Sequence, residues 1–255
     1  MKFNSIISII RYTILQNFRN KTLYVLVLFV SIMFVASFLF STLGGEQEKR
    51  LLFDLGIGCI EIFGLIVAVF TAVTLLLEEL ESRTIYLVLS RPIMRYHYII
   101  GRYAGLLLSV ALSVILMGCI HFALLLFKGW EFDMRYFLLI LLTLEKISVI
   151  SSIALFFSLF STSAASSIVF TLFFWVLGHF AVELRFLGSR LDSMFKFAIK
   201  IMYYLVPNLQ YFNLRDQWDL STFSFKFIGI ASIYGIIYIM VCLSFCTALF
   251  NRKEF

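Results

Sequence analysis

The sequence predicts an all-α integral membrane protein with six transmembrane helices. Of its 255 residues, 62% are hydrophobic and 14% are charged, whereas soluble domains are about 45–50% apolar and about 25% charged. The apolar runs are continuous and do not alternate, which favours helices over the strands of a membrane barrel. The chain contains only two prolines, as long uninterrupted helices require.

Each expected span is a run of about 20 mostly apolar residues, which is the length that crosses about 30 Å of hydrocarbon. Six runs meet this requirement, and together they define a single transmembrane domain over residues 1–255. The predicted spans are residues 22–43, 55–77, 99–127, 136–160, 165–187 and 227–250.

Residues 1–21 precede the first span and have a helical periodicity. Ile6, Ile10 and Ile14 fall on one face, and polar residues such as Arg11 fall on the other. This spacing predicts an amphipathic helix that lies in the membrane surface, and the alternative is a polar tail without regular structure. The polar stretch is too long for the first region of a cleaved signal peptide, so we expect none.

The longest connection between spans is residues 188–226, which we expect on the extracytoplasmic side. Its first half, residues 189–206, is again amphipathic and predicts a second interfacial helix. Pro207 and Asn208 end that helix, because proline cannot continue one. A polar loop is expected to follow at residues 210–222.

The net charge of +6 indicates lysines and arginines that flank spans and meet anionic lipid. No aromatic-basic motif points to nucleic acid. Lysines and arginines on the two sides of the membrane are equal in number, so the first helix decides the orientation. It has four basic residues before it and two after it, which predicts that both termini are cytoplasmic in a multi-pass cell-membrane protein.

Residues 78–98 form a highly charged connection between two long apolar runs, and this orientation makes them cytoplasmic. Three carboxylates end the second span, at Glu78, Glu79 and Glu81. The apolar run at 85–89 is too short to cross a bilayer and too apolar to remain uncovered in water. We therefore expect a short helix that docks on a partner; the alternative is a solvated connector whose arginines only fix the topology.

Short motifs in and after this connection follow a distinctive order. Glu-Ser-Arg-Thr at 81–84 precedes the apolar run, Leu-Ser-Arg-Pro at 89–92 follows it, and Gly-Arg at 101–102 opens the next span. Later motifs are Leu-Glu at 144–145, Leu-Phe-Ser-Thr at 159–162, Leu-Gly-His at 177–179 and Val-Pro-Asn at 206–208. This order resembles that of ABC-2 type transporter permeases. Arg91 departs from the pattern, because the family often has a small residue before the proline.

The resemblance implies a permease subunit of an ATP-binding-cassette exporter in the bacterial inner membrane. Such a subunit dimerises, and the expected partner is a second copy of this permease, with a heterodimer as the open alternative. It docks separate ATPase subunits, which bind the ATP and magnesium. By resemblance, the docking residues in the coupling helix are Ser82, Arg83, Thr84, Ile85, Tyr86 and Leu89. The resemblance also allows an extracytoplasmic accessory protein as a partner, and it leaves the exported cargo open.

The sequence lacks the motifs of a nucleotide-hydrolysing or metal-binding enzyme. No G-x-x-x-x-G-K-[ST] motif is present to hold a nucleotide's phosphates. All four cysteines lie in apolar runs, where a cysteine behaves as a small hydrophobic residue. We therefore expect no catalytic residue, cofactor or metal in this chain. The alternative function is a non-transporting scaffold or assembly factor whose loop docks another protein; a membrane enzyme or carrier ranks last.

Several ionisable residues lie inside the predicted spans, where charges are costly and are often functional. They are Glu61, His121, Glu145, Lys146, His179 and Glu183. Two interpretations remain open for them, namely polar contacts that hold helices together and groups that line a translocation path. His121 lies near the outer end of its span, where we expect it to face water.

The spacing of these residues suggests their partners. Glu145 and Lys146 are adjacent, so they point about 100° apart on a helix and each needs another helix as partner. The preferred pairing joins Glu145 to His179, and a second joins Lys146 to Glu61. His179 and Glu183 lie one turn apart, but two ligands on one helix do not complete a metal site. A carboxylate–imidazole pair that holds helices together is favoured.

Overall fold

A computed structural model describes residues 7, 9–14, 22–43, 45–81, 95–131, 133–161, 163–190, 193–213 and 225–252. The long elements are α2 (Thr22–Leu43), α3 (Glu48–Glu81), α5 (Arg95–Phe127), α6 (Met134–Phe160), α7 (Ala164–His179), α8 (Ala181–Arg190), α9 (Ser193–Leu205) and α10 (Phe225–Arg252), with short 3-10 helices η1 (Gly45–Gln47) and η2 (Leu209–Phe212). These parts of the chain contain helices and no strand, which confirms the all-α prediction.

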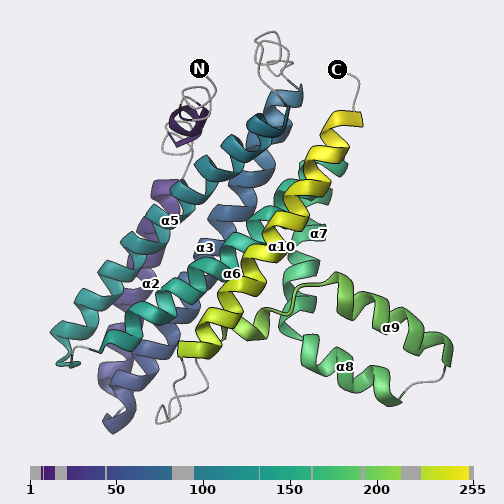
Figure 1. Ribbon diagram of the computed structural model, residues 1–255. Coiled ribbons are helices and arrows are strands. Elements are labelled where there is room, and N and C mark those ends of the chain that lie inside the picture. Colours follow the sequence, from purple (N-terminus) through teal and green to yellow (C-terminus); the bar gives the residue numbers. More distant parts are fainter. Residues whose placement is uncertain are drawn as a thin grey trace.

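The long helices run up and down in one bundle, and residues 9–14 and the last turn of α10 lie at the same end of it (Figure 1). We call this the near end and define it by Glu81, Arg95 and Arg252, where α3 ends, α5 begins and α10 ends. The opposite, far end holds the first turns of α3 and α6. The α8–α9 hairpin projects sideways from the bundle (Figure 1).

Within the described ranges, five helices are long and apolar enough to cross a membrane. Their apolar stretches are Tyr24–Thr42, Glu48–Leu77, Arg95–Phe127, Met134–Phe160 and Lys226–Arg252. They match five of the six predicted spans, but α3 begins at Glu48 rather than at residue 55. Its first turn is held by Lys128, whose Nζ lies 2.8 Å from Glu48 Oε1, and by Lys49, which donates to the carbonyl of Gly129 at 2.9 Å.

The fifth predicted span, residues 165–187, is not one continuous helix. α7 has 16 residues, about 24 Å at 1.5 Å per residue, which is shorter than about 30 Å of hydrocarbon. Phe180 separates α7 from α8, and Glu183 and Arg185 are exposed on α8. Hydropathy does not predict this break, because the end of α7 is bound by a residue far away in the sequence. Gln210 donates a hydrogen bond to the carbonyl of His179.

The described start of the polar loop predicted at residues 210–222 differs from the prediction, and residues 214–222 lie outside the described part of the chain. α9 ends at Leu205, before Pro207 as expected, but η2 then turns into the bundle. Leu209 and Phe212 are buried, in a core cluster that also holds residues of α3, α6 and α10, and η2 packs against α6, α7 and α10. These two apolar side chains explain the burial, because they gain more from the core than from water.

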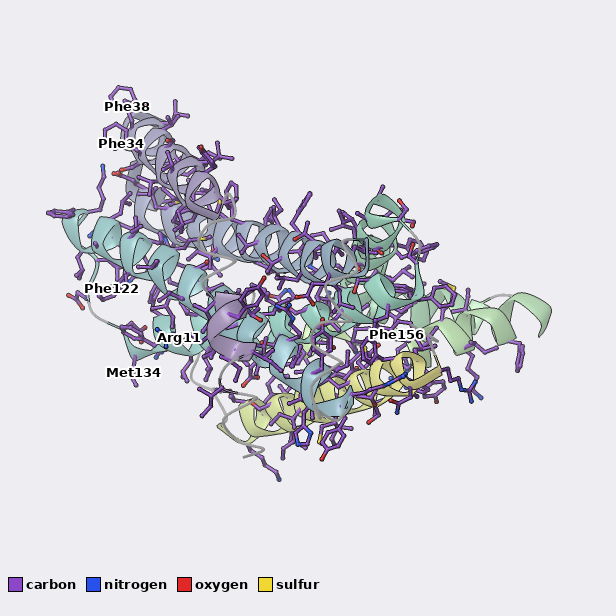
Figure 2. The ribbon with its side chains drawn as sticks, turned by 90° about the horizontal axis from the view of Figure 1, so that it is seen from above. Arg11, Phe34, Phe38, Phe122, Met134 and Phe156 are labelled. Carbon is purple, nitrogen blue, oxygen red and sulfur yellow. The ribbon has the colours of Figure 1, made fainter. Side chains whose placement is uncertain are left out.

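α3 and α6 form the centre of the bundle. α3 packs against α2, α5, α6 and α7, and α6 packs against α3, α5, α7 and α10. Gly64 permits the close approach of α3 to α6, since a Cβ there would lie 2.6 Å from Cδ1 of Ile147. On the periphery, Phe34 and Phe38 point outward from α2 (Figure 2), as expected of side chains that face lipid.

Residues 9–14 are helical and lie against the near-end part of α5. A Cβ on Gly101 would lie 3.2 Å from Ile9, and one on Gly105 would lie 2.7 Å from Cβ of Thr13. The two glycines therefore give this short segment room to pack closely on α5. Most of the amphipathic helix predicted at residues 1–21 lies outside the described part of the chain.

Candidate functional site

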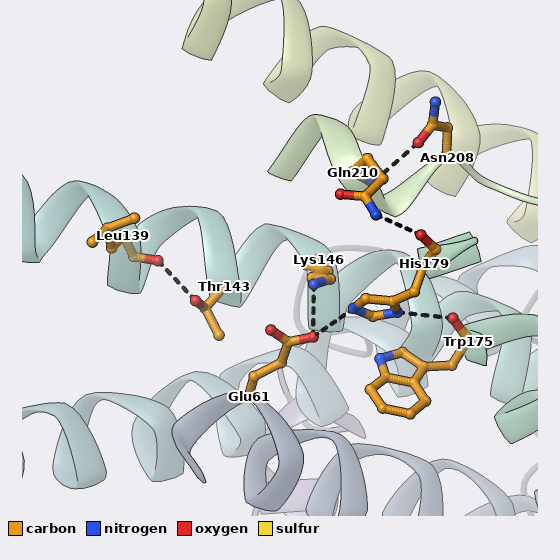
Figure 3. Close-up of polar contacts among 8 residues, drawn as sticks. All are labelled: Glu61, Leu139, Thr143, Lys146, Trp175, His179, Asn208 and Gln210. Atoms are coloured by element: carbon orange, nitrogen blue, oxygen red, sulfur yellow. Dashed lines mark hydrogen bonds and ion pairs between the residues drawn. The ribbon is translucent and has the colours of Figure 1, made fainter. Parts of the chain in front are cut away.

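Three ionisable side chains from three helices meet inside the bundle. Glu61 of α3 accepts from Lys146 of α6, whose Nζ lies 2.6 Å from Glu61 Oε1. The same carboxylate oxygen lies 3.0 Å from Nε2 of His179, the last residue of α7 (Figure 3). We call these residues the Glu61 cluster. Because Lys146 is only 3% exposed, its charge requires this carboxylate partner.

His179 connects the cluster to the end of α7. Its Nδ1 lies 3.0 Å from the carbonyl oxygen of Trp175, so both ring nitrogens face oxygen atoms. The backbone carbonyl of His179 accepts from Nε2 of Gln210 at 2.5 Å (Figure 3). The cluster therefore joins α3 and α6 to the end of α7 and to η2.

The observed partners decide between the two predicted pairings. The pairing of Lys146 with Glu61 is confirmed, and the preferred pairing of Glu145 with His179 is wrong. Glu145 accepts from the hydroxyl of Ser232 on α10, with distances of 2.8 Å and 3.0 Å to its two oxygens. The favoured carboxylate–imidazole contact between helices does exist, but its carboxylate belongs to Glu61.

Glu183 does not join the cluster. It lies on α8, beyond the break at Phe180, and its side chain is exposed. The expected one-turn relation to His179 therefore does not hold, because the two residues belong to different helices.

His121 is buried, which contradicts the expectation that it faces water. Its Nδ1 lies 3.1 Å from the hydroxyl of Tyr136, and its Nε2 lies 3.2 Å from the carbonyl oxygen of Leu52. The ring lies against Gly56, where a Cβ would overlap it. His121 therefore fastens α3 to α5 and α6 near the far end, and it does not reach the Glu61 cluster.

A second buried polar group lies at the near end, and sequence reasoning did not identify it as a site. Arg102 of α5 forms an ion pair with Glu79 of α3, and the hydroxyl of Tyr98 donates to the same carboxylate. Arg102 also donates to the hydroxyl of Thr13 at 2.9 Å. We call these four residues the near-end node. The available signal was an arginine beside two glycines, four residues apart, in an apolar helix.

The C-terminal end of α10 is also attached to the start of α5. Arg95 donates to the backbone carbonyls of Phe250 and Asn251, at 2.9 Å and 3.1 Å. A cation at the last carbonyls of a helix is stabilising, since it meets the negative end of the helix dipole. α3, α5, α10 and residues 9–14 are thus linked to one another at the near end.

The sequence matches the family described as ABC-2 family transporter protein over residues 7–255. The match covers nearly the whole chain. The chain belongs to the ABC-2 transporter family. Members of the ABC-2 family are typically non-catalytic transmembrane subunits, and they generally work with an ABC ATPase. No curated protein matches the chain.

The residues that the ABC-2 resemblance assigns to docking lie outside the described part of the chain. They are Ser82, Arg83, Thr84, Ile85, Tyr86 and Leu89. The structure describes the helices on either side of them, namely α3 to Glu81 and α5 from Arg95. In this ABC-2 protein, the near-end node therefore joins the two helices that flank residues 82–94.

Proposed function

We propose that this protein is the membrane-spanning subunit of an ATP-driven exporter, and that two copies form the translocation path. Residues 82–89 would dock as a coupling helix on a separate ATPase, which binds the ATP and magnesium. The observation that carries the proposal, beside the family, is the buried pair of Glu79 and Arg102. It holds together the two helices that must receive any force applied to the loop between them.

The near-end node gives a physical route for coupling. A push on residues 82–94 reaches α3 and α5 together, because breaking a buried ion pair costs about 3–5 kcal/mol. α3 then carries the motion inward to Glu61, which lies 18 residues before Glu79, or about 27 Å along a helix. In this proposal, a rearrangement of α3, α6 and α7 at the Glu61 cluster would open or close the path.

The topology in the proposal has six crossings with both termini in the cytoplasm. α6 ends at the near end, whereas α10 starts at the far end and returns (Figure 1). The chain between Phe160 and Phe225 must therefore traverse the bundle once, and α7 supplies most of that crossing. The α8–α9 hairpin would lie toward the extracytoplasmic side, where membrane lipid and an accessory protein could contact it.

Co-purification tests the proposal against the alternative of a non-transporting scaffold. The tagged chain is expressed with its natural chromosomal neighbours, and eluted proteins are sequenced for an ATPase with a G-x-x-x-x-G-K-[ST] motif. We expect an ATPase to co-elute, and we expect the double change Arg83→Glu with Ile85→Asp to remove it. The matched control is Arg185→Glu with Val182→Asp, which makes the same kinds of change at exposed positions of α8.

Retention of the ATPase by the Arg83→Glu, Ile85→Asp double variant would contradict the assignment of the docking segment. Elution with a cytoplasmic partner that has no nucleotide-binding motif would instead favour the scaffold.

A further inference from the structure

The segment that follows α9 turns back into the bundle, and we call residues 206–213 the re-entrant segment. Leu209 is fully buried and Phe212 is 3% exposed. They belong to the same core cluster as buried residues of α3, α6 and α10, and η2 itself packs against α6, α7 and α10. Two glycines provide the space, since a Cβ on Gly178 would lie 2.7 Å from Cγ of Leu209, and one on Gly235 would lie 3.1 Å from Cζ of Phe212. The segment is therefore seated closely between α7 and α10.

Polar contacts fix the re-entrant segment to α7 and to α10. The backbone N–H of Asn208 donates to the hydroxyl of Tyr234 on α10 at 2.8 Å. The side chain of Asn208 accepts from the N–H of Gln210 at 3.1 Å, which orders the first turn of η2. Gln210 in turn donates to the carbonyl of His179, the last residue of α7. The position of the re-entrant segment therefore depends on the position of the last residue of α7.

The end of α7 is held in place by Glu61. The ring of His179 lies between the Glu61 carboxylate and the carbonyl of Trp175, so its backbone carbonyl points at Gln210 (Figure 3). Lys146 holds the other side of the same carboxylate oxygen. A chain of direct contacts thus runs from α3 and α6, through the last residue of α7, to the re-entrant segment.

We propose that Glu61 is the positioning residue of a seal. It holds the end of α7 so that the re-entrant segment closes the interior between α3, α6 and α10 from the far side. Release of the contact between Glu61 and His179 unseats Leu209 and Phe212 and opens that interior to water. The role of this seal in transport rests on the proposed function, in which the motion of α3 would release the contact between Glu61 and His179.

The seal is tested on the chain alone in lipid nanodiscs, without an ATPase, so its outcome is separate from the docking experiment. A single reporter, Leu209→Cys, is placed in a chain whose four natural cysteines are replaced by alanine. The rate of labelling by a water-soluble maleimide measures how often the seat opens. Glu61→Gln is expected to raise this rate about tenfold or more, which corresponds to about 1.4 kcal/mol.

A second variant removes the contact to α7 while the ion pair stays intact. His179→Phe leaves Glu61 and Lys146 paired, so it tests the seal even if Glu61→Gln does not yield folded protein. The same increase in labelling is expected. Glu145→Gln is the matched control, since Glu145 is a carboxylate at the adjacent position of α6 that bonds Ser232 instead of His179. We expect no change in that variant.

A second reporter separates local opening from general loosening. Ala68→Cys lies on α3, seven residues after Glu61, and it is fully buried in a different core cluster. Glu61→Gln and His179→Phe should leave its labelling unchanged. The inference is overturned if both variants leave Leu209→Cys unreactive, or if they expose Ala68→Cys as much as Leu209→Cys.

Discussion

Replacing Arg102 tests how strongly the near-end node binds its helices together. In Arg102→Met, the hydroxyl of Tyr98 is the one donor that Glu79 keeps among the described residues, and its charge stays buried, because the Glu79 side chain is 8% exposed. Removal of one partner of a buried ion pair costs about 3–5 kcal/mol. For a chain of this size each kcal/mol shifts the melting temperature by about 2–4 °C, so we expect a fall of about 6–20 °C.

The assay is thermal unfolding of the purified chain in one detergent, followed by a double-mutant cycle. In Arg102→Met with Glu79→Gln no charge remains in the near-end node, and the amide oxygen can still accept from Tyr98. The double variant should therefore regain most of the lost stability. Arg102→Lys should lie between the two, since an ammonium keeps the charge but loses the fork that also reaches Thr13.

The reasoning is refuted if Arg102→Met melts within about 2 °C of the natural protein, because a loss of about 1 kcal/mol would already produce a larger shift. It is also refuted if the double variant is as unstable as the sum of the single variants, because the two charges would then act independently.

Three further predictions concern other contacts. Gly105→Leu should displace residues 9–14 from α5, because even a Cβ at position 105 would lie 2.7 Å from Cβ of Thr13. The rate of amide hydrogen exchange in residues 9–14 should therefore rise. His121→Leu should cost about 0.5–1.5 kcal/mol in thermal unfolding through lost hydrogen bonds, and unchanged stability would contradict its fastening role. Glu145→Gln should change stability by less than about 1 kcal/mol, since Ser232 can still donate to the amide oxygen.

The helical class of the protein could be predicted from composition. A bilayer permits only structures that satisfy every backbone hydrogen bond internally, so long apolar runs without alternation leave helices as the answer. The five long helices follow from the same rule. The break at Phe180 does not, because a hydropathy pattern contains no information about Gln210, which binds the end of α7 from 31 residues away.

The partners of the intramembrane charges could be predicted only in part. The cost of a buried charge shows that Lys146 needs a carboxylate, and Glu61 is one of few candidates. The rotation of each helix about its axis is set by packing, such as the approach of α3 to α6 at Gly64. For this reason Glu145 turned toward Ser232 instead of His179, and the near-end node, which needs Thr13 from outside the spans, was missed.

The most direct test of the central claim is a photo-crosslinker at Tyr86, inside the proposed coupling helix. The residue is replaced by a photoreactive phenylalanine analogue, cells are irradiated, and the crosslinked protein is identified by mass spectrometry. The proposed function predicts a protein with a G-x-x-x-x-G-K-[ST] motif, and loss of that product when Arg83→Glu is added. A crosslink to an extracytoplasmic protein, or to no nucleotide-binding protein, would contradict the claim that this segment receives the work of an ATPase.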